Sequence, residues 1–179
     1  MASLSNSPTA APFPTSETQA TSIYLGTFGA VLMDPFNPQD RYMLVDCQES
    51  FVVGEIVAID KDGLATQVGS ASVGQLGMVV ATVSGSDTAA WVQVTGEWSN
   101  AIVTSDVTTA ALLLAPATTD GGYLGILTSS GGNAVIGARA VTAPSTSTSP
   151  AFGGALATIY VGMGGAWVNG VNIDLGLVS

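Results

Sequence analysis

Short runs of β-branched and aromatic residues alternate with turn residues through the middle of the chain, from residue 51 to residue 98. The apolar runs in this stretch cover residues 52–59, 78–83 and 91–94. Residues 60–63 (DKDG) and 84–87 (SGSD) have the composition of tight turns. Strand-length runs separated by turns at close, regular intervals are typical of an antiparallel sheet. The pattern predicts an all-β fold, a small antiparallel β-barrel or sandwich.

Strand-like segments also flank this central stretch. Residues 22–33 predict the first ordered strand region, and residues 41–47 predict a strand that follows a rigid double turn at 34–40. Residues 133–141 predict one further strand. Residues 99–114 carry mixed signals, because a Ser-Asp pair suited to cap a helix is followed by β-branched residues that are poor helix formers.

A short glycine-containing motif occurs twice in this core. Residues 74–79 read GQLGMV, and residues 122–127 read GYLGIL. Glycine beside a strand often marks a bulge or a sharp corner, which a small barrel needs in order to close. The repetition predicts two similarly shaped strands, each entered through a tight glycine turn.

The N-terminal residues differ in composition from the core. Residues 1–22 are rich in Ser, Thr, Ala and Pro, and the prolines exclude a helix or a central strand. We expect an extended arm, which is either a disordered tail or a segment that becomes ordered on a neighbouring subunit, with Phe13 as its anchor. The β-barrel core domain is then expected to span residues 23–143.

The C-terminal part is expected to extend from the core. Residues 144–152 have the Ser/Thr/Pro composition of a linker. Within residues 153–179, Asn169-Gly170 lies between two β-branched runs, which is the strongest short-range signal of a β-hairpin. The pattern predicts a C-terminal β-hairpin that packs on the core or on a partner, since an isolated hairpin is marginally stable.

Charged residues make up only 9% of the chain, against roughly 25% in an ordinary soluble domain. Because subunit interfaces are depleted in charge, we expect much of the surface to be covered by other subunits. The net charge is −10, and the only cations are Arg41, Lys61 and Arg139. We therefore expect no direct nucleic-acid contact, since such proteins present clustered Lys and Arg to phosphates. An acidic protein can still belong to a particle that encloses nucleic acid, on the side facing away from it.

A membrane role is also not expected. No stretch approaches the ~20 apolar residues that a membrane-spanning helix needs, and the most apolar region, residues 153–168, is interrupted by glycines. The first residues lack the basic and apolar regions of a secretory signal.

The residue types that most catalytic sites use are scarce. The chain has no histidine and one cysteine, Cys47, which excludes histidine-activated nucleophiles, histidine metal sites and thiolate metal clusters. Cys47 is expected to be a small buried core residue. The glycine-rich residues 162–165 precede a strand-like run and not the helix of a phosphate loop, and residues 60–63 lack most ligands of a calcium loop. We expect no enzymatic activity, cofactor or metal.

The three tryptophans, Trp91, Trp98 and Trp167, alternate with valine in strand-like runs. Packing within the sheet or at an interface is the expected role for them. A platform on which a carbohydrate stacks is the alternative.

Five short motifs follow one another between residues 53 and 141. They are Val53-Gly54-Glu55-Ile56-Val57, Leu76-Gly77-Met78-Val79, Val92-Gln93-Val94-Thr95-Gly96-Glu97-Trp98, Leu124-Gly125-Ile126 and Ala138-Arg139-Ala140-Val141. In their order and spacing they resemble the small β-barrel cement (head decoration) proteins of tailed bacteriophages. The resemblance covers about half of the chain and leaves out both terminal extensions.

The resemblance implies a non-enzymatic structural protein that forms a homotrimer on the outer surface of an icosahedral virion. Its partners would be the major capsid protein and other copies of itself. The candidate residues for these contacts are Phe13, Tyr24, Phe36, Trp167 and Asn169.

Two other functions stay open. One is a different structural module of a virion or cell surface, such as a fibre base or an adhesin. The other is a carbohydrate-binding or hydrolytic β-domain that uses a tryptophan together with a carboxylate.

Overall fold

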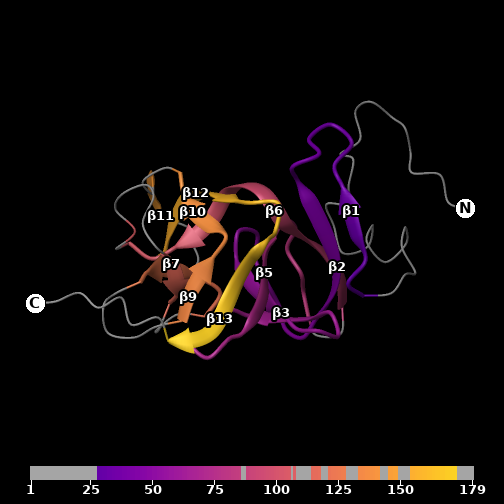
Figure 1. The fold of residues 1–179 in the computed structure, drawn as a ribbon, viewed down its shortest axis with the longest axis horizontal. Helices are drawn as coiled ribbons and strands as arrows, with labels where there is room; N and C mark the ends of the chain where they lie inside the picture. Colours follow the sequence, from indigo (N-terminus) through magenta and orange to yellow (C-terminus); the bar gives the residue numbers. More distant parts are fainter. Residues whose placement is uncertain are drawn as a thin grey trace, which may run out of the picture.

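A computed structural model describes residues 28–85, 88–105, 107, 114–117, 121–127, 133–141, 145–148 and 154–172, with residues 88, 145–148 and 169–172 described by their backbone alone. These residues form thirteen strands and no helix (Figure 1). The strands are β1 Val31–Met33, β2 Arg41–Cys47, β3 Ile56–Ile59, β4 Leu64–Gln67, β5 Gly74–Val79, β6 Thr88–Val103, β7 Leu114–Pro116, β8 Leu124–Ile126, β9 Asn133–Ile136, β10 Ala138–Ala140, β11 Ser145–Thr148, β12 Ala155–Val161 and β13 Ala166–Asn172.

Five of these strands close into a barrel. β6 pairs with β2 on one side and β5 on the other, β5 pairs with β3, and β3 pairs with β4. The ring closes where β4 pairs with β2 in parallel, whereas the other four pairings are antiparallel. The prediction of an all-β fold built on a small barrel is confirmed. Cys47 lies fully buried in the barrel interior, as expected, beside such residues as Val45, Val57 and Val92.

The longest strand, β6, takes part in two sheets. Its first half belongs to the barrel, and its second half pairs with β12, which in turn pairs with β10 and β11. Gly96 marks the change, with a φ of +92° that favours glycine over every other residue. At its far end, Val103 pairs in parallel with Leu124 of β8. β6 therefore joins the barrel to a second layer of strands.

A second hydrophobic core fills the space between the outside of the barrel and this second layer. All four residues of β3 are buried, because Val57 and Ile59 point into the barrel core while Ile56 and Ala58 belong to the second core. Trp98 on β6, with none of its surface exposed, lies in the second core. The molecule thus combines a barrel and a sandwich.

The repeated glycine motif places a positive-φ glycine at the entry of each strand, as predicted, but the two strands are not alike. β5 begins at Gly74 with φ +128°, and Gly122 with φ +82° precedes β8. A Cβ atom on Gly74 would lie 2.7 Å from the carbonyl oxygen of Ile59, so only glycine fits this entry. The two strands differ in their pairing, since β5 is antiparallel to its neighbours and β8 is parallel to β6.

The predicted C-terminal hairpin is wrong in its turn and in its pairing. Asn169 and Gly170 lie within β13, and the turn is formed by residues 162–165, where Gly165 has φ +78° and donates to the carbonyl of Gly162. The strands on either side do not pair with each other. Instead β12 inserts beside β6, and β13 pairs with β5 and β9. The two strands are integral parts of the cores and not an added ribbon.

Two further expectations need correction, and two others are described only in part. The single strand predicted at 133–141 is interrupted at Gly137, so that β9 joins β13 and β10 joins β12. Part of the predicted linker 144–152 is strand β11, which pairs with β12. In the mixed segment 99–114, β6 continues to Val103, and most of the residues after 105 lie outside the described residues. Of the first strand region predicted at 22–33, the described part forms β1.

Candidate interaction surfaces

Two of the five predicted contact residues are exposed side chains of the described structure. Phe36 has 81% of its surface exposed and Trp167 has 46%. Asn169 is described by its backbone alone, within β13, and Phe13 and Tyr24 lie outside the described residues. Phe36 and Trp167 each lie among further exposed apolar side chains, and these groups define two candidate surfaces.

The first group, here called the hairpin surface, consists of Val31, Met33 and Phe36 on the β1–β2 hairpin. Leu32 packs against the cluster of Leu44 and Trp91. Because side chains alternate along a strand, Val31 and Met33 then face away from that cluster, and both are exposed. The hairpin stands at one side of the molecule in Figure 1, and its loop of residues 34–40 projects beyond the barrel.

The loop that carries Phe36 is held by its own hydrogen bonds. Oδ1 of Asp34 accepts from the backbone N–H groups of Phe36 (2.8 Å) and Asn37 (3.3 Å). The N–H of Asp40 donates to the carbonyl of Asn37, and the Asn37 amide donates to the Asp40 carboxylate. The phenyl ring is therefore exposed on a preorganised loop, which lowers the entropic cost of binding through it.

The same loop is fastened to β6. The N–H of Glu97 donates to Oδ1 of Asp40 (3.3 Å), and Oγ1 of Thr95 donates to the carbonyl of Gln39 (2.6 Å). Between them lies Gly96, where a Cβ atom would come within 1.8 Å of Oδ1 of Asp40. Because Gly96 has no Cβ atom, the hairpin loop can pack closely against β6.

The hairpin surface is acidic. Asp34, Asp40 and Glu97 lie at the loop and its seat, and Arg41 is the one cation of the hairpin. Burial, followed by the charges of Asp34 and Glu97, raises the pKa of Asp40, although its hydrogen bonds from Glu97 and Asn37 oppose this. Burial, with the nearby carboxylates of Asp40 and Asp34, raises the pKa of Tyr42 to about 12.

The second group, here called the β13 surface, consists of Ile136, Met163 and Trp167. Ile136 on β9 lies directly opposite Trp167 on β13, so the two side chains share one face. Nε1 of Trp167 donates to the carbonyl of Gly164 (2.8 Å), which holds the indole against the turn that carries Met163. All three side chains are about half exposed.

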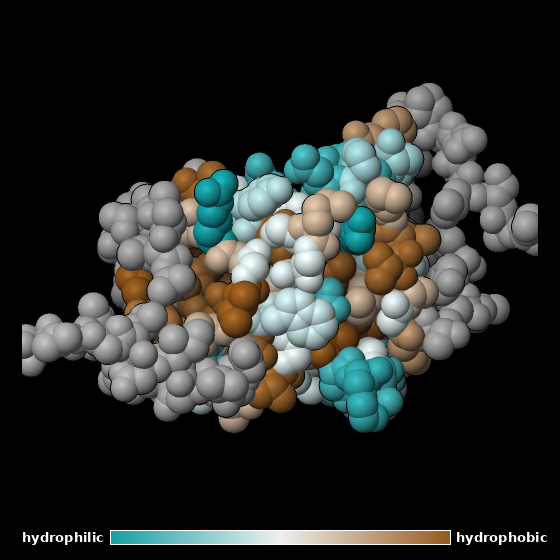
Figure 2. Space-filling view, in the orientation of Figure 1, coloured by the Kyte–Doolittle hydropathy of each residue, from teal (hydrophilic) through white to brown (hydrophobic). Residues whose placement is uncertain are grey.

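The β13 surface has the opposite electrostatic character. Residues 133–141 and 162–168 contain no carboxylate, and their one cation is Arg139. The Arg139 guanidinium lies 5.6 Å from the centre of the Tyr160 ring, within the range of a cation–π contact. Figure 2 shows mostly pale and brown residues in the middle of this face, with hydrophilic residues in separate groups towards its upper and lower edges.

The tryptophans are divided between core and surface. Trp91 and Trp98 are buried, in the β2–β6 cluster and the second core respectively, so neither can form a platform for a ligand. Trp167 is the exposed one. The expectation of packing is confirmed for the first two residues.

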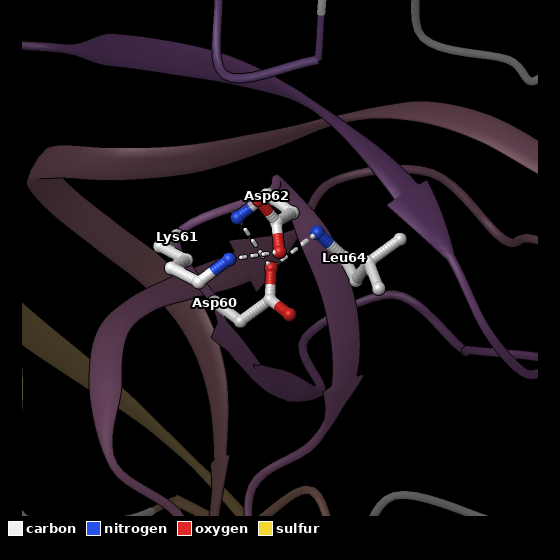
Figure 3. A network of polar contacts seen from close by, with 4 residues as sticks. All are labelled: Asp60, Lys61, Asp62 and Leu64. Carbon is white, nitrogen blue, oxygen red and sulfur yellow. Dashed lines mark hydrogen bonds and ion pairs between the residues drawn. The ribbon is translucent and has the colours of Figure 1, made fainter.

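Residues 60–63 form the turn that joins β3 to β4, as predicted. Oδ1 of Asp60 accepts from the N–H groups of Asp62 (2.8 Å) and Leu64 (3.0 Å), and Lys61 forms an ion pair with Asp62 (Figure 3). One carboxylate oxygen is thus used to organise the turn itself. Beside it lies an open groove of about 440 Å³ lined by polar and small apolar side chains, among them Gln48, Thr66 and Ser72.

One carboxyl group of the described structure is almost completely buried. Oε2 of Glu55 accepts from the N–H of Val52 at 2.6 Å, and Oε1 accepts from the amide of Gln67 at 3.2 Å. Burial raises the pKa of Glu55, assisted by the charge of Glu49. Its contacts join the strand entry to β4, which is a structural use of the carboxylate.

The described residues contain no group of three or more His, Cys, Asp or Glu side chains placed to hold a metal ion. Among the same residues, no helix is long and apolar enough to cross a membrane. The chain matches no family model, no curated protein and no solved structure.

Proposed function

We propose that this chain is a structural protein of a bacteriophage virion, a cement or decoration protein that binds the outer surface of the assembled head and stabilises it. The single observation that carries the proposal is a β-barrel body with only 9% charged residues and two preorganised, exposed apolar surfaces. A protein of this kind gains stability by covering such surfaces with other proteins. The resemblance of its core motifs to phage cement proteins supports the shell and other copies of the chain as the partners.

In this function the chain acts by contact alone. A homotrimer presents its capsid-binding side three times, so contacts that are individually weak combine into firm attachment to neighbouring subunits of the major capsid protein. Bridging those subunits opposes the outward pressure of packaged DNA.

The distribution of cations supports a position on the outer face of the shell. Arg41 lies on β2, Lys61 forms an ion pair at the β3–β4 turn, and Arg139 stacks on Tyr160 of β12. Three cations at separate places do not form a phosphate-binding patch. A chain with net charge −10 is better placed away from the DNA.

Particles assembled with and without the protein test this proposal. Cryo-electron microscopy is expected to show additional density on the outside of the shell at a symmetry axis. The decorated particles are expected to release DNA at a higher temperature than the bare ones. Shells of equal stability with no additional density would contradict the proposal, and density confined to the tail would favour the alternative of a fibre-base protein.

A further inference from the structure

The hairpin surface and the β13 surface match in hydrophobicity and differ in charge. Each presents three exposed apolar side chains, including one aromatic ring. The carboxylates of Asp34, Asp40 and Glu97 lie at the hairpin loop and at its contact with β6, whereas residues 133–141 and 162–168, which include the β13 surface, hold no carboxylate and one cation, Arg139. Two hairpin surfaces brought together would repel each other, but a hairpin surface and a β13 surface would attract.

The two surfaces are neighbours on the molecule. Asp40 of the hairpin loop accepts from the N–H of Glu97 on β6, and Glu97 lies opposite Tyr160 on β12. Tyr160 in turn lies opposite Arg139 on β10. Three adjacent strands therefore connect the hairpin loop to Tyr160 and Arg139, which lie three residues along the chain from Met163 and Ile136 of the β13 surface.

Symmetry limits how identical copies can use such surfaces. In a cyclic trimer every contact joins two different surfaces, because a contact between identical surfaces closes a dimer. Seen from one copy, the other two copies of a closed trimer lie in neighbouring directions. Two complementary surfaces at neighbouring positions suit this arrangement, while surfaces at opposite ends would favour a filament.

We propose that the β13 surface of one copy docks on the hairpin surface of the next copy, and that this head-to-tail contact builds the oligomer. The inference rests on the proposed function for the number of copies. The contact buries Trp167, Met163 and Ile136 against Phe36, Met33 and Val31, and it brings Arg139 towards the carboxylates around the hairpin loop.

Two variants each disrupt one of the two surfaces that form this contact. Phe36→Asp places a charge on the hairpin surface, where the side chain is exposed and the backbone N–H keeps its bond to Asp34. The double variant Ile136→Asp/Met163→Asp does the same on the β13 surface and leaves the Trp167 indole bond in place. The matched control is Val53→Asp, which charges an exposed valine that belongs to neither surface and precedes Gly54, whose carbonyl accepts from the N–H of Ile102 on β6.

The oligomeric state of each protein, alone and in equimolar mixture, is measured by sedimentation velocity, with circular dichroism melting as the check of folding. Wild type and Val53→Asp are expected to sediment as the same oligomer, and each surface variant alone as a monomer. The mixture of the two surface variants is expected to form a species of two chains, because each variant supplies the half that the other lacks.

Retention of the wild-type oligomer by either surface variant, or a mixture that stays monomeric, would overturn the head-to-tail contact. A wild-type protein that is monomeric at all concentrations would overturn it as well. Binding of the same proteins to bare phage heads is measured separately by co-sedimentation. Heads that bind wild-type protein while the complementation fails would leave the proposed function standing and remove only this contact.

Discussion

The hairpin surface and the β13 surface reach the same result, an exposed aromatic ring on a fixed backbone, by different means. At the hairpin, polar side chains hold a projecting loop, with Asp34 and Asp40 accepting backbone N–H groups. At the β13 surface, backbone pairing on both edges of β13 and one indole hydrogen bond hold Trp167. The first surface therefore depends on carboxylates and on pH, and the second depends on strand packing. We therefore expect the two surfaces to be destabilised by different substitutions and to respond differently to pH.

The largest effect is expected from Gly137→Ala, at the point where β9 changes into β10. Gly137 has φ +88°, and a Cβ atom would lie 2.3 Å from the carbonyl oxygen of Gly165, a backbone atom that cannot rotate away. We expect a loss of about 4 kcal/mol in the free energy of unfolding, from strain and displacement of the turn. Urea denaturation measures it, with Gly164→Ala as control, since nothing lies within 4 Å of that position. Equal stability of the two variants would contradict the prediction.

Gly96→Ala is expected to cost somewhat less, about 2–3 kcal/mol. The added methyl group would meet Oδ1 of Asp40, which belongs to a side chain and can move if the loop is released. The damage should therefore concentrate in the hairpin, with faster amide hydrogen exchange at Glu97 and Asn37 and little change in β13. Exchange that accelerates equally in β13 would show that the hairpin loop is not an independent unit.

Trp167→Phe tests the single polar bond of the β13 surface. The substitution keeps an aromatic ring and removes the bond from Nε1 to the carbonyl of Gly164, which is exposed to solvent. We expect a loss of about 1 kcal/mol or less in the free energy of unfolding. Chemical denaturation measures it, and Trp98→Phe offers a contrast because that indole is buried in the second core. A loss for Trp167→Phe as large as that of Gly137→Ala would refute this account.

The smallest effect is a pH dependence confined to the hairpin. Because the pKa of Asp40 is raised above its ordinary value of 3.8, the folded protein holds the proton more tightly than the unfolded chain. The contribution of Asp40 to stability is then greatest at low pH and falls as the pH rises through the folded pKa. NMR titration of the carboxyl group measures the shift, and Asp40→Asn should remove this part of the pH dependence. A folded pKa at or below 3.8 would contradict the prediction.

Local chemistry in the sequence was sufficient for several features. The turn at residues 60–63, the burial of Cys47 and the glycine entries of β5 and β8 each follow from a few neighbouring residues. These features do not depend on which distant strand lies alongside.

The positions of the C-terminal strands depend on pairing with strands distant in the sequence, and local sequence patterns do not indicate which strands pair. Residues 162–165 and Asn169-Gly170 are competing turn signals a few residues apart. The pairing of β13 between β5 and β9 selects the first and extends Asn169 and Gly170 into a strand. In the same way, the position of Gly137 leaves no room for a Cβ atom beside the carbonyl of Gly165, a contact that no local pattern reveals.

The candidate surfaces were predictable only in part. Phe36 and Trp167 were identified from the sequence and are exposed. Met33 and Ile136 were missed, because an apolar residue in a strand-like run points to the core or to the outside according to which face is covered. The alternation around Leu32 was a usable signal, but its direction required the packing of Leu44 and Trp91.

Gly96 has a mechanical consequence. The hairpin loop is fastened to Thr95 and Glu97 of β6, on either side of the residue where that strand passes from the barrel into the second layer. A force that pulls on the loop is transmitted along one continuous backbone into both hydrophobic interiors at once. The body should therefore resist such a load as one unit, and yield in a single step.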